Sequence, residues 1–199
     1  LMTGCGKDAK KTEDNQSGLQ QDVVPPTEAP TATSAPKEVV DYAAQVEFNM
    51  SSNSAKVEAT VKTYVDGDTT HFYVPNSLMS TGVLKARFLA VNTPESTGKI
   101  EEYGKKAAAF TKEKLSAATS IIIESDTADW VADSTGDRYL SWIWYKTADS
   151  ADYRNLNVEL LQEGLAIASN SSQNRYGDIC MAALNQARAS VPFSGLGAR

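Results

Sequence analysis

Hydrophobic and polar positions alternate along residues 55–65 with the period of two that is typical of a half-buried strand. The face expected to point inward holds Val57, Ala59, Val61, Thr63 and Val65. After an Asp-Gly pair, residues 69–74 continue as a second strand, so the two segments predict a β-hairpin. Gly67 is expected to have a positive φ at the turn, which would place Asp66 and Asp68 around the hairpin corner.

A third strand is predicted over residues 83–91, where every second residue from Leu84 to Ala90 is apolar. Arg87 lies on the opposite face of this strand and is therefore available for a ligand. Pro94 fixes its own φ and favours an extended backbone at Thr93, so we expect the strand to stop there.

The second half of the chain adds helical periodicity to the pattern. The elements predicted there are a helix over 103–118, strands over 120–125 and 139–145, a short helix over 157–163 and a last helix over 175–189. Gly164 is placed to cap the short helix at its C-terminus. Three strands, a helix, two strands and further helices indicate an α+β domain, and five strands suit a small barrel.

The first 37 residues have a different character. Four of the seven prolines precede residue 37, and no strand or helix period is present. This composition cannot bury enough apolar surface to offset the entropy of ordering, so we interpret residues 6–37 as a flexible tether and 38–199 as the folded domain. The sequence Leu1-Met2-Thr3-Gly4-Cys5 resembles a bacterial lipobox, although a frayed terminus with an incidental cysteine would read the same way.

Composition limits the class of protein. The chain of 199 residues is 41% apolar and 22% charged, as expected of a globular protein with a substantial core. Its net charge of −6 argues against non-specific coating of nucleic acid but leaves room for a small cationic site. Cys180 falls on an apolar helical stripe and is expected to be a buried, inert thiol, and no apolar run reaches the roughly 18 residues of a membrane-spanning helix.

Candidate chemistry concentrates between Asp66 and Glu95. This stretch places carboxylates, a carboxamide and a guanidinium at the ends of predicted strands. Oxygen donors suit a hard cation such as Ca²⁺ or Mg²⁺, and the arginine suits a phosphate. His71 lies mid-strand without a partner for nucleophilic catalysis and is interpreted as a structural residue. The acids at 126, 129, 133 and 137 lack the residue spacing of an EF-hand Ca²⁺ loop, so we interpret them as part of a solvated loop.

Five collinear motifs resemble the staphylococcal nuclease (thermonuclease) family. They are Asp66-Gly67-Asp68-Thr69, the run Arg87-Phe88-Leu89-Ala90-Val91-Asn92-Thr93-Pro94-Glu95, Tyr103-Gly104 with Ala109-Phe110, the run Arg138-Tyr139-Leu140-Ser141-Trp142-Ile143-Trp144, and Asn157 followed by Gly164-Leu165-Ala166. They span roughly residues 57–190. The resemblance implies a five-stranded OB-fold β-barrel with three helices and Ca²⁺-dependent hydrolysis of DNA and RNA.

The resemblance also implies roles for individual residues. Arg87 and Arg138 resemble the paired guanidiniums that bind the scissile phosphate, and Glu95 resembles the carboxylate that orients or deprotonates the attacking water. Asp68, the side chain of Asn92 and the carbonyl of Thr93 are similar to the metal ligands. Asp66 is similar to a supporting acid at the turn.

The sequence departs from the family pattern at three places. Asn92 stands where the best-known member has an aspartate, which should weaken metal binding by removing a formal charge. The tyrosine expected two residues before Arg138 is absent, and so are the tyrosines expected after Gly164-Leu165-Ala166. Tyr176 or Trp130 could replace these aromatics, but each is better interpreted as a packing residue.

The sequence therefore favours a monomeric nuclease anchored through a lipid on Cys5 at the outer face of a bacterial membrane, or secreted. The alternative is an OB-fold nucleic-acid-binding module with weak or absent turnover, which Asn92 favours and the presence of Arg87, Glu95 and Arg138 opposes.

Overall fold

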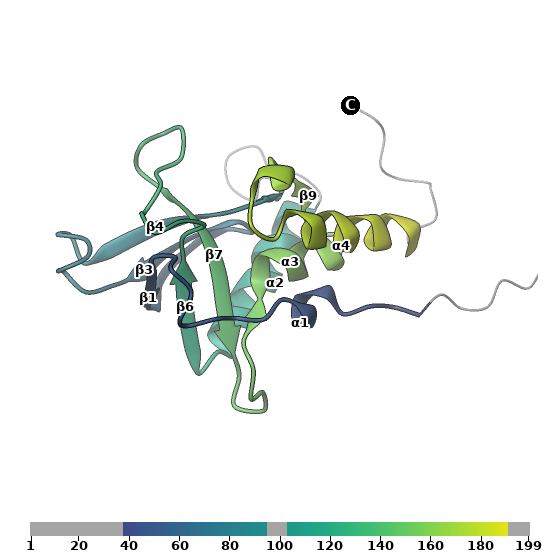
Figure 1. The fold of residues 1–199 in the computed structure, drawn as a ribbon, viewed down its shortest axis with the longest axis horizontal. Helices are drawn as coiled ribbons and strands as arrows, with labels where there is room; N and C mark the ends of the chain where they lie inside the picture. The colour runs from purple at the N-terminus through teal and green to yellow at the C-terminus, as the bar shows by residue number, and fades with distance from the viewer. Residues whose placement is uncertain (1–37, 95–102, 191–199) are drawn as a thin grey trace, which may run out of the picture. The chain divides into compact units, whose positions relative to one another are not determined.

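Paired β-strands form the framework of the protein in a computed structural model, which describes residues 38–94 and 103–190 (Figure 1). The predicted tether with Cys5 and the candidate residue Glu95 lie outside the described residues. The strands of the main sheet are β1 (Lys56–Glu58), β2 (Thr60–Asp66), β3 (Thr69–Tyr73), β4 (Val83–Phe88), β6 (Ser120–Glu124), β7 (Tyr139–Lys146) and β8 (Arg154–Asn155). A separate two-stranded sheet joins β5 (Val91–Asn92) to β9 (Ile167–Ala168).

The main sheet has the order β1-β6-β7-β4-β3-β2, with β8 beside β7. All of its pairs are antiparallel except β4 and β7, which run parallel and place Arg87 opposite Leu140. The edge strands β1 and β2 are consecutive in the chain. No hydrogen-bonded pairing joins these two edges within residues 38–94 and 103–190, so the α+β class is confirmed while a closed barrel is not observed.

Four α-helices and one short 3₁₀ helix occur among the described residues. They are α1 (Tyr42–Gln45), α2 (Gly104–Ser116), α3 (Leu156–Gln162), the 3₁₀ helix η1 (Ser171–Gln173) and α4 (Gly177–Ser190). The Asn155 side chain caps α3 by accepting a hydrogen bond from the backbone N–H of Val158. Gly164 follows the helix with a φ of 67°, as its predicted capping role requires. The prediction of three helices missed α1, which lies against α3 and α4 (Figure 1).

The predicted first strand is divided into two. Ala59 separates β1 from β2, and its N–H donates to the carbonyl of Ile121. Within β2 the register shifts between Val61 and Thr63, so Lys62 is an extra residue relative to β3. Because a bulge moves the following side chains to the other face, Thr63 is exposed and Tyr64 is half-buried, so the predicted inward face is wrong at these two residues. A second register shift between Tyr64 and Asp66 follows, and Val65 is half-buried.

The core forms between the sheet and the helices. Fully buried side chains include Trp142, Trp144, Phe72, Ile143 and Leu160. Tyr176 packs edge-on against Trp142 and Trp144, with ring centroids 5.0 and 5.7 Å away, as a packing residue should. Cys180 is buried, and burial raises the pKa of its thiol to about 12, which agrees with the predicted inert role. None of the helices in the described ranges is long and apolar enough to cross a bilayer.

Gly67 forms the β2–β3 turn for a different reason from the one predicted. The residues with positive φ in the described ranges are Ala90, Asn170, Gly82, Gly136 and Gly164, so Gly67 is not left-handed. A Cβ added at Gly67 would instead lie 2.6 Å from the Cβ of Ala107 and 2.8 Å from Cγ2 of Thr93. The missing side chain lets α2 and the start of the 93–94 segment approach the turn.

We expect Gly67→Ala to lower the free energy of unfolding by about 1–3 kcal/mol, because the added methyl overpacks this contact. Urea denaturation of Gly67→Ala, of Ala107→Gly and of the double variant measures the coupling free energy between positions 67 and 107. Ala107→Gly alone should cost about 1 kcal/mol as a glycine within a helix. In the Gly67→Ala background, Ala107→Gly should lower the free energy of unfolding by less, because it removes the clashing methyl. If the losses of unfolding free energy in the two single variants simply add in the double variant, the steric explanation is contradicted.

Candidate active site

The β2–β3 turn presents Asp68, a carboxylate that is only 4% exposed. Its oxygen Oδ2 accepts a 2.6 Å hydrogen bond from the backbone N–H of Thr93, and Oδ1 accepts one from the hydroxyl of Thr69 at 3.2 Å. The N–H of Asp68 donates to Oδ1 of Asp66 at 3.3 Å. Asp66 therefore supports the turn, while Asp68 joins the turn to the segment after β5.

Arg87 extends from β4 toward the same point. Its Nη1 lies 2.9 Å from Oδ2 of Asp68, and its Nη2 donates to Oδ1 of Asn92 at 2.8 Å. Nη1 also donates to the carbonyl of Val91 at 3.1 Å. The guanidinium is thus held by acceptors from separate segments of the chain, with 17% of the side chain exposed.

The segment between β4 and β5 is held from behind by buried polar groups. The Asn157 side chain donates to the carbonyls of Leu89 and Ser141 at 2.9 and 3.0 Å. The Ser171 hydroxyl donates to the carbonyl of Ala90 at 3.0 Å. Ala90 has a φ of 64°, which is strained for a residue with a Cβ and persists only where its surroundings determine it. These contacts fix where Asn92 and Thr93 leave the sheet.

Arg138 precedes β7 in a second cluster. Its Nε and Nη2 both lie 2.7 Å from Oδ2 of Asp133, whose other oxygen accepts from the N–H and hydroxyl of Thr135. Gly136 turns the loop with a φ of 74°. Burial acts to raise the pKa of Asp133, but the hydrogen bonds from Thr135 and Arg138 outweigh it and hold that pKa below its usual range.

The sheet register relates the two arginines. Arg87 pairs with Leu140 across the parallel strands, and Arg138 lies in the bend that leads into β7, two residues before Leu140. Each arginine is held by its own carboxylate, Arg87 by Asp68 and Arg138 by Asp133.

Of the candidate residues, the structure brings together Arg87, Asp68, Asn92 and Thr93, with Asp66 behind the turn. Arg138 lies just before β7 in a separate cluster with Asp133. The position of Glu95 relative to them is outside the described residues.

The model of a protein family described as staphylococcal nuclease homologue matches residues 85–191, over half of the chain. The chain belongs to this family. No match was found among curated proteins. Family membership indicates a nuclease-type hydrolase and an OB-like fold.

The matched region of the staphylococcal nuclease homologue family contains Arg87, Asn92, Thr93, Glu95 and Arg138. It begins after the β2–β3 turn, so Asp66 and Asp68 precede it. The structure connects the turn to the matched region directly, through the contacts of Asp68 with Arg87 and Thr93.

The oxygens available for a cation are few but of suitable type. Asp68 supplies a carboxylate, Asn92 an amide oxygen and Thr93 a backbone carbonyl, and the first two already face a positively charged group. Oxygen-only donors fit Ca²⁺, which takes 6–8 oxygen ligands and completes its shell with water or substrate. No cluster of three or more His, Cys, Asp or Glu side chains suited to a metal occurs in residues 38–94 and 103–190. A site here would therefore carry little protein charge.

Three of the four loop acids have side-chain partners, contrary to the prediction of a solvated loop, whereas Asp129 is exposed as predicted. Asp126 accepts from Nε1 of Trp142 at 2.8 Å and from the N–H of Arg175 at 3.1 Å. Asp133 holds Arg138, and Asp137 forms an ion pair with Lys85. A signal for the role of Asp133 was present in the sequence, because an Asp followed three residues later by Gly and five later by Arg can close a turn that brings the acid to the arginine.

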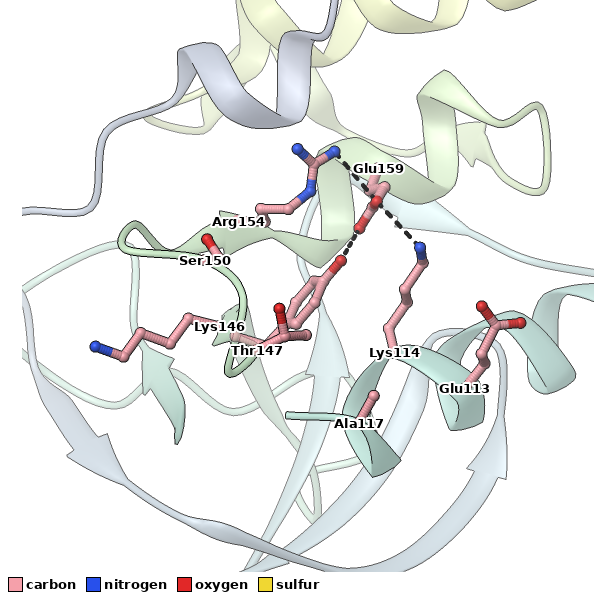
Figure 2. Close-up of a pocket in the computed structure, with 9 residues that line it drawn as sticks. Glu113, Lys114, Ala117, Lys146, Thr147, Ser150, Arg154 and Glu159 are labelled. Atoms are coloured by element: carbon pink, nitrogen blue, oxygen red, sulfur yellow. Dashed lines mark hydrogen bonds and ion pairs between the residues drawn. The ribbon is translucent and has the colours of Figure 1, made fainter. Parts of the chain in front are cut away.

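A hollow of about 380 Å³ at the other end of β7 contains a third charged cluster (Figure 2). Buried Glu159 accepts from the Tyr145 hydroxyl at 2.6 Å and from Nη2 of Arg154 at 3.2 Å, and Nζ of Lys114 lies 3.6 Å away. Burial and the neighbouring Glu159 raise the pKa of Tyr145. Arg154 also binds Asp41, which precedes α1. These groups satisfy one another, so the cluster ties α1, α2, α3 and β7 together.

We expect Asp133→Asn to reduce the free energy of unfolding by about 1–3 kcal/mol near pH 6, because it removes a charged hydrogen-bond acceptor. A carboxylate with a lowered pKa stabilises the fold above its ordinary pKa, and that stabilisation disappears as the pH falls through its pKa in the folded protein. The difference from the original protein should therefore narrow below about pH 4 in urea titrations. Asp149→Asn, at an exposed aspartate, is the control for the loss of one carboxylate. If the difference in unfolding free energy between Asp133→Asn and the original protein did not change with pH, this reasoning would be contradicted.

Proposed function

We propose that the chain is a Ca²⁺-dependent nuclease that hydrolyses phosphodiester bonds of DNA and RNA and leaves 3′-phosphate products. The observation that supports this most is the arrangement of Arg87, held at 2.9 Å from Asp68 and 2.8 Å from Asn92. A fixed guanidinium beside oxygen donors suits a phosphate and a hard cation bound side by side.

The arginines act on the charge of the phosphate. Phosphodiester hydrolysis increases negative charge on the non-bridging oxygens, and cationic donors fixed in advance stabilise that charge without reorganising. Arg87 is fixed by Asp68, Asn92 and the Val91 carbonyl. Arg138 is fixed by Asp133, which we assign as a positioning residue. Glu95 would accept the proton of the attacking water.

Asp68, Asn92 and the Thr93 carbonyl would hold Ca²⁺. When bound, this cation polarises the phosphate and lowers the pKa of a bound water. In the chain itself, the hydrogen bond from the Thr93 N–H fixes Asp68 and the Arg87 guanidinium fixes Asn92. The oxygen donors are therefore oriented by groups that belong to the same site.

Asn92 gives some support to a second candidate function, a nucleic-acid-binding module with weak turnover. With an amide at this position, the three proposed ligands carry one formal negative charge, from Asp68. Binding of phosphate by the two arginines does not require that charge. Dependence of the rate on Ca²⁺ separates the two functions.

The proposed setting of the enzyme rests on the sequence. The lipobox-like Cys5 and the Pro-rich segment after it support a protein that is lipid-anchored at the outer face of a bacterial membrane, or secreted, where Ca²⁺ is plentiful. We propose that it acts there as a monomer. The family's OB-like fold supports a sheet that curls toward a barrel, with the site at the ends of β2, β4 and β7.

Hydrolysis of single-stranded DNA with Ca²⁺ should be readily measurable and should be abolished by EDTA. Arg138→Ala should lower the rate roughly 10²- to 10³-fold, the effect of losing one preorganised charge-stabilising donor. Lys146→Ala, at the far end of β7, is the charge-matched control and should match the original protein. Equal rates for original protein and Arg138→Ala, with Ca²⁺ and with EDTA, would contradict the proposed function.

We expect Asn92→Asp to lower the Ca²⁺ concentration that gives half-maximal rate, because a carboxylate adds a formal charge to the site. A Ca²⁺ titration of the rate measures this effect directly. Gln45→Glu, which adds the same charge on the exposed surface of α1, should leave the midpoint unchanged. An unchanged midpoint in Asn92→Asp would show that the side chain at 92 is not a ligand.

A further inference from the structure

A cationic and aromatic surface continues along the sheet from the proposed site. The antiparallel register of β3 and β4 places Thr69 opposite Arg87, then His71 opposite Lys85, then Tyr73 opposite Val83. Since alternate residues of a strand share a face, these three pairs form one row on the outer face of the two strands. The row begins at the guanidinium of Arg87 and extends away from it.

The outer end of this row is open to solvent. Tyr73 is 54% exposed, one of the few large hydrophobic side chains so exposed among the described residues, and the Lys85 side chain is 38% exposed. The helices pack elsewhere: in Figure 1 they gather at the opposite end of the molecule from the projecting part of β3 and β4. An exposed aromatic ring on an uncovered sheet face suggests a binding surface rather than core packing.

Strand β2 adds a second lysine to the face. Thr60 pairs with Tyr73 across the two strands, and Lys62 follows two residues later on the same side of β2. Its Nζ lies 5.7 Å from the centroid of the Tyr73 ring, so a cation stands beside the exposed ring.

The local field at this face is positive although the chain carries a net charge of −6. His71 lies in the middle of the row, opposite Lys85. Partial burial, together with the positive charges of Lys85 and Lys62, lowers the pKa of His71, and the opposing effect of Asp137 is smaller. Lys62 adds a second ammonium group to the face, so the ion pair between Lys85 and Asp137 does not cancel its positive charge.

We propose that this face, the β3–β4 platform (Lys62, His71, Tyr73 and Lys85), binds a single-stranded segment of nucleic acid that continues from the scissile phosphate, with a base stacked on Tyr73 and phosphates near the two lysines. The proposal rests on the nuclease function proposed above and deepens it by naming the substrate as an unpaired strand. The platform supplies the stacking surface that the absent tyrosines of the family pattern leave unprovided. OB-like folds bind oligonucleotides on the face of their second and third strands, which here are β3 and β4.

Distance makes the proposal depend on substrate length. Tyr73 lies four residue steps beyond Thr69 in β3, which corresponds to about 13 Å along the strand. A dinucleotide bound at the arginines does not extend over this span, whereas a dodecanucleotide does. A duplex keeps its bases stacked on one another and cannot present one to Tyr73 without unpairing.

The test measures binding of fluorescein-labelled dT dodecamer and dT dinucleotide by anisotropy with Ca²⁺, in an Arg138→Ala background that suppresses cleavage. Tyr73→Leu should weaken binding of the dodecamer by about 10-fold, within the range for loss of one stacked base, and leave the dinucleotide unchanged. Tyr73→Phe keeps the ring and should bind both as the background protein does. Equal dodecamer affinity for Tyr73→Leu and its background, or equal losses for both lengths, would overturn the platform.

Two charge variants act in opposite directions. Lys85→Ala should weaken dodecamer binding and reduce the slope of log affinity against log salt by about 0.7, the value for one phosphate contact on a single strand. Asp137→Asn should tighten dodecamer binding, because it frees Lys85 from its ion pair, and a damaged fold cannot explain a gain. Lys146→Ala is the remote control, and an Asp137→Asn affinity no higher than the background would count against the platform.

The single histidine of the sequence gives a spectroscopic readout that does not depend on turnover. The NMR-titrated pKa of His71 should rise when the dodecamer binds, because a nearby phosphate favours the imidazolium, and should not change with the dinucleotide. Failure of the nuclease function would appear separately, as absence of Ca²⁺-dependent cleavage in the original protein. If the original protein is active and the Tyr73→Leu variant still cleaves and binds the dodecamer normally, the proposed nuclease function stands and the platform proposal is wrong.

Discussion

A single buried carboxamide determines where the candidate active site can form. Asn157 is fully buried, accepts a hydrogen bond from the N–H of Ile143 and donates to the carbonyls of Ser141 and Leu89. It therefore joins α3 to β7 and to the turn after β4 at the same time. A buried amide that lost any of these partners would leave a polar group unsatisfied, so the three segments are held in one arrangement. The left-handed Ala90 next to this junction is tolerated because its carbonyl is held by Ser169 and Ser171.

The consequence of that junction is a site whose charges face one another before substrate is present. After the turn at Ala90, β5 runs so that the Asn92 side chain accepts a hydrogen bond from the Arg87 guanidinium and the Thr93 N–H donates to Asp68. Gly67 admits the close approach of α2 that completes the same corner. A guanidinium between a carboxylate and an amide oxygen loses little side-chain freedom when a phosphate binds. In this way, packing on the far side of the sheet contributes to electrostatic preorganisation at the site.

Much of this arrangement could be predicted from local patterns, and the remainder depended on contacts between distant residues. Period-two alternation located the strands, and Gly164 located the end of α3, because both signals are local. The bulge at Lys62 was missed because it depends on pairing with β3, and α1 was missed because its stability comes from packing and from the Asp41–Arg154 ion pair. For Asp68 and Arg87, the sequence predicted only that both lie at strand ends in one candidate site, and their direct contact was not predicted. Asp133 was misread as solvated because its partner lies across a turn that no periodicity reveals.

Net charge is a weak guide to ligands for a protein of this kind. The excess of acidic residues is compatible with phosphate binding because several acids are used internally: Glu124 pairs with Arg175, Glu159 with Arg154 and Asp133 with Arg138. On the outer face of β3 and β4, by contrast, Lys62 and Lys85 lie close to His71 and Arg87 opens the row. A locally positive face on an acidic molecule favours one orientation of approach for a polyanion, since other faces repel it. A positive sheet face of this size can therefore orient an approaching nucleic acid, but it does not attract the polyanion strongly to the protein as a whole.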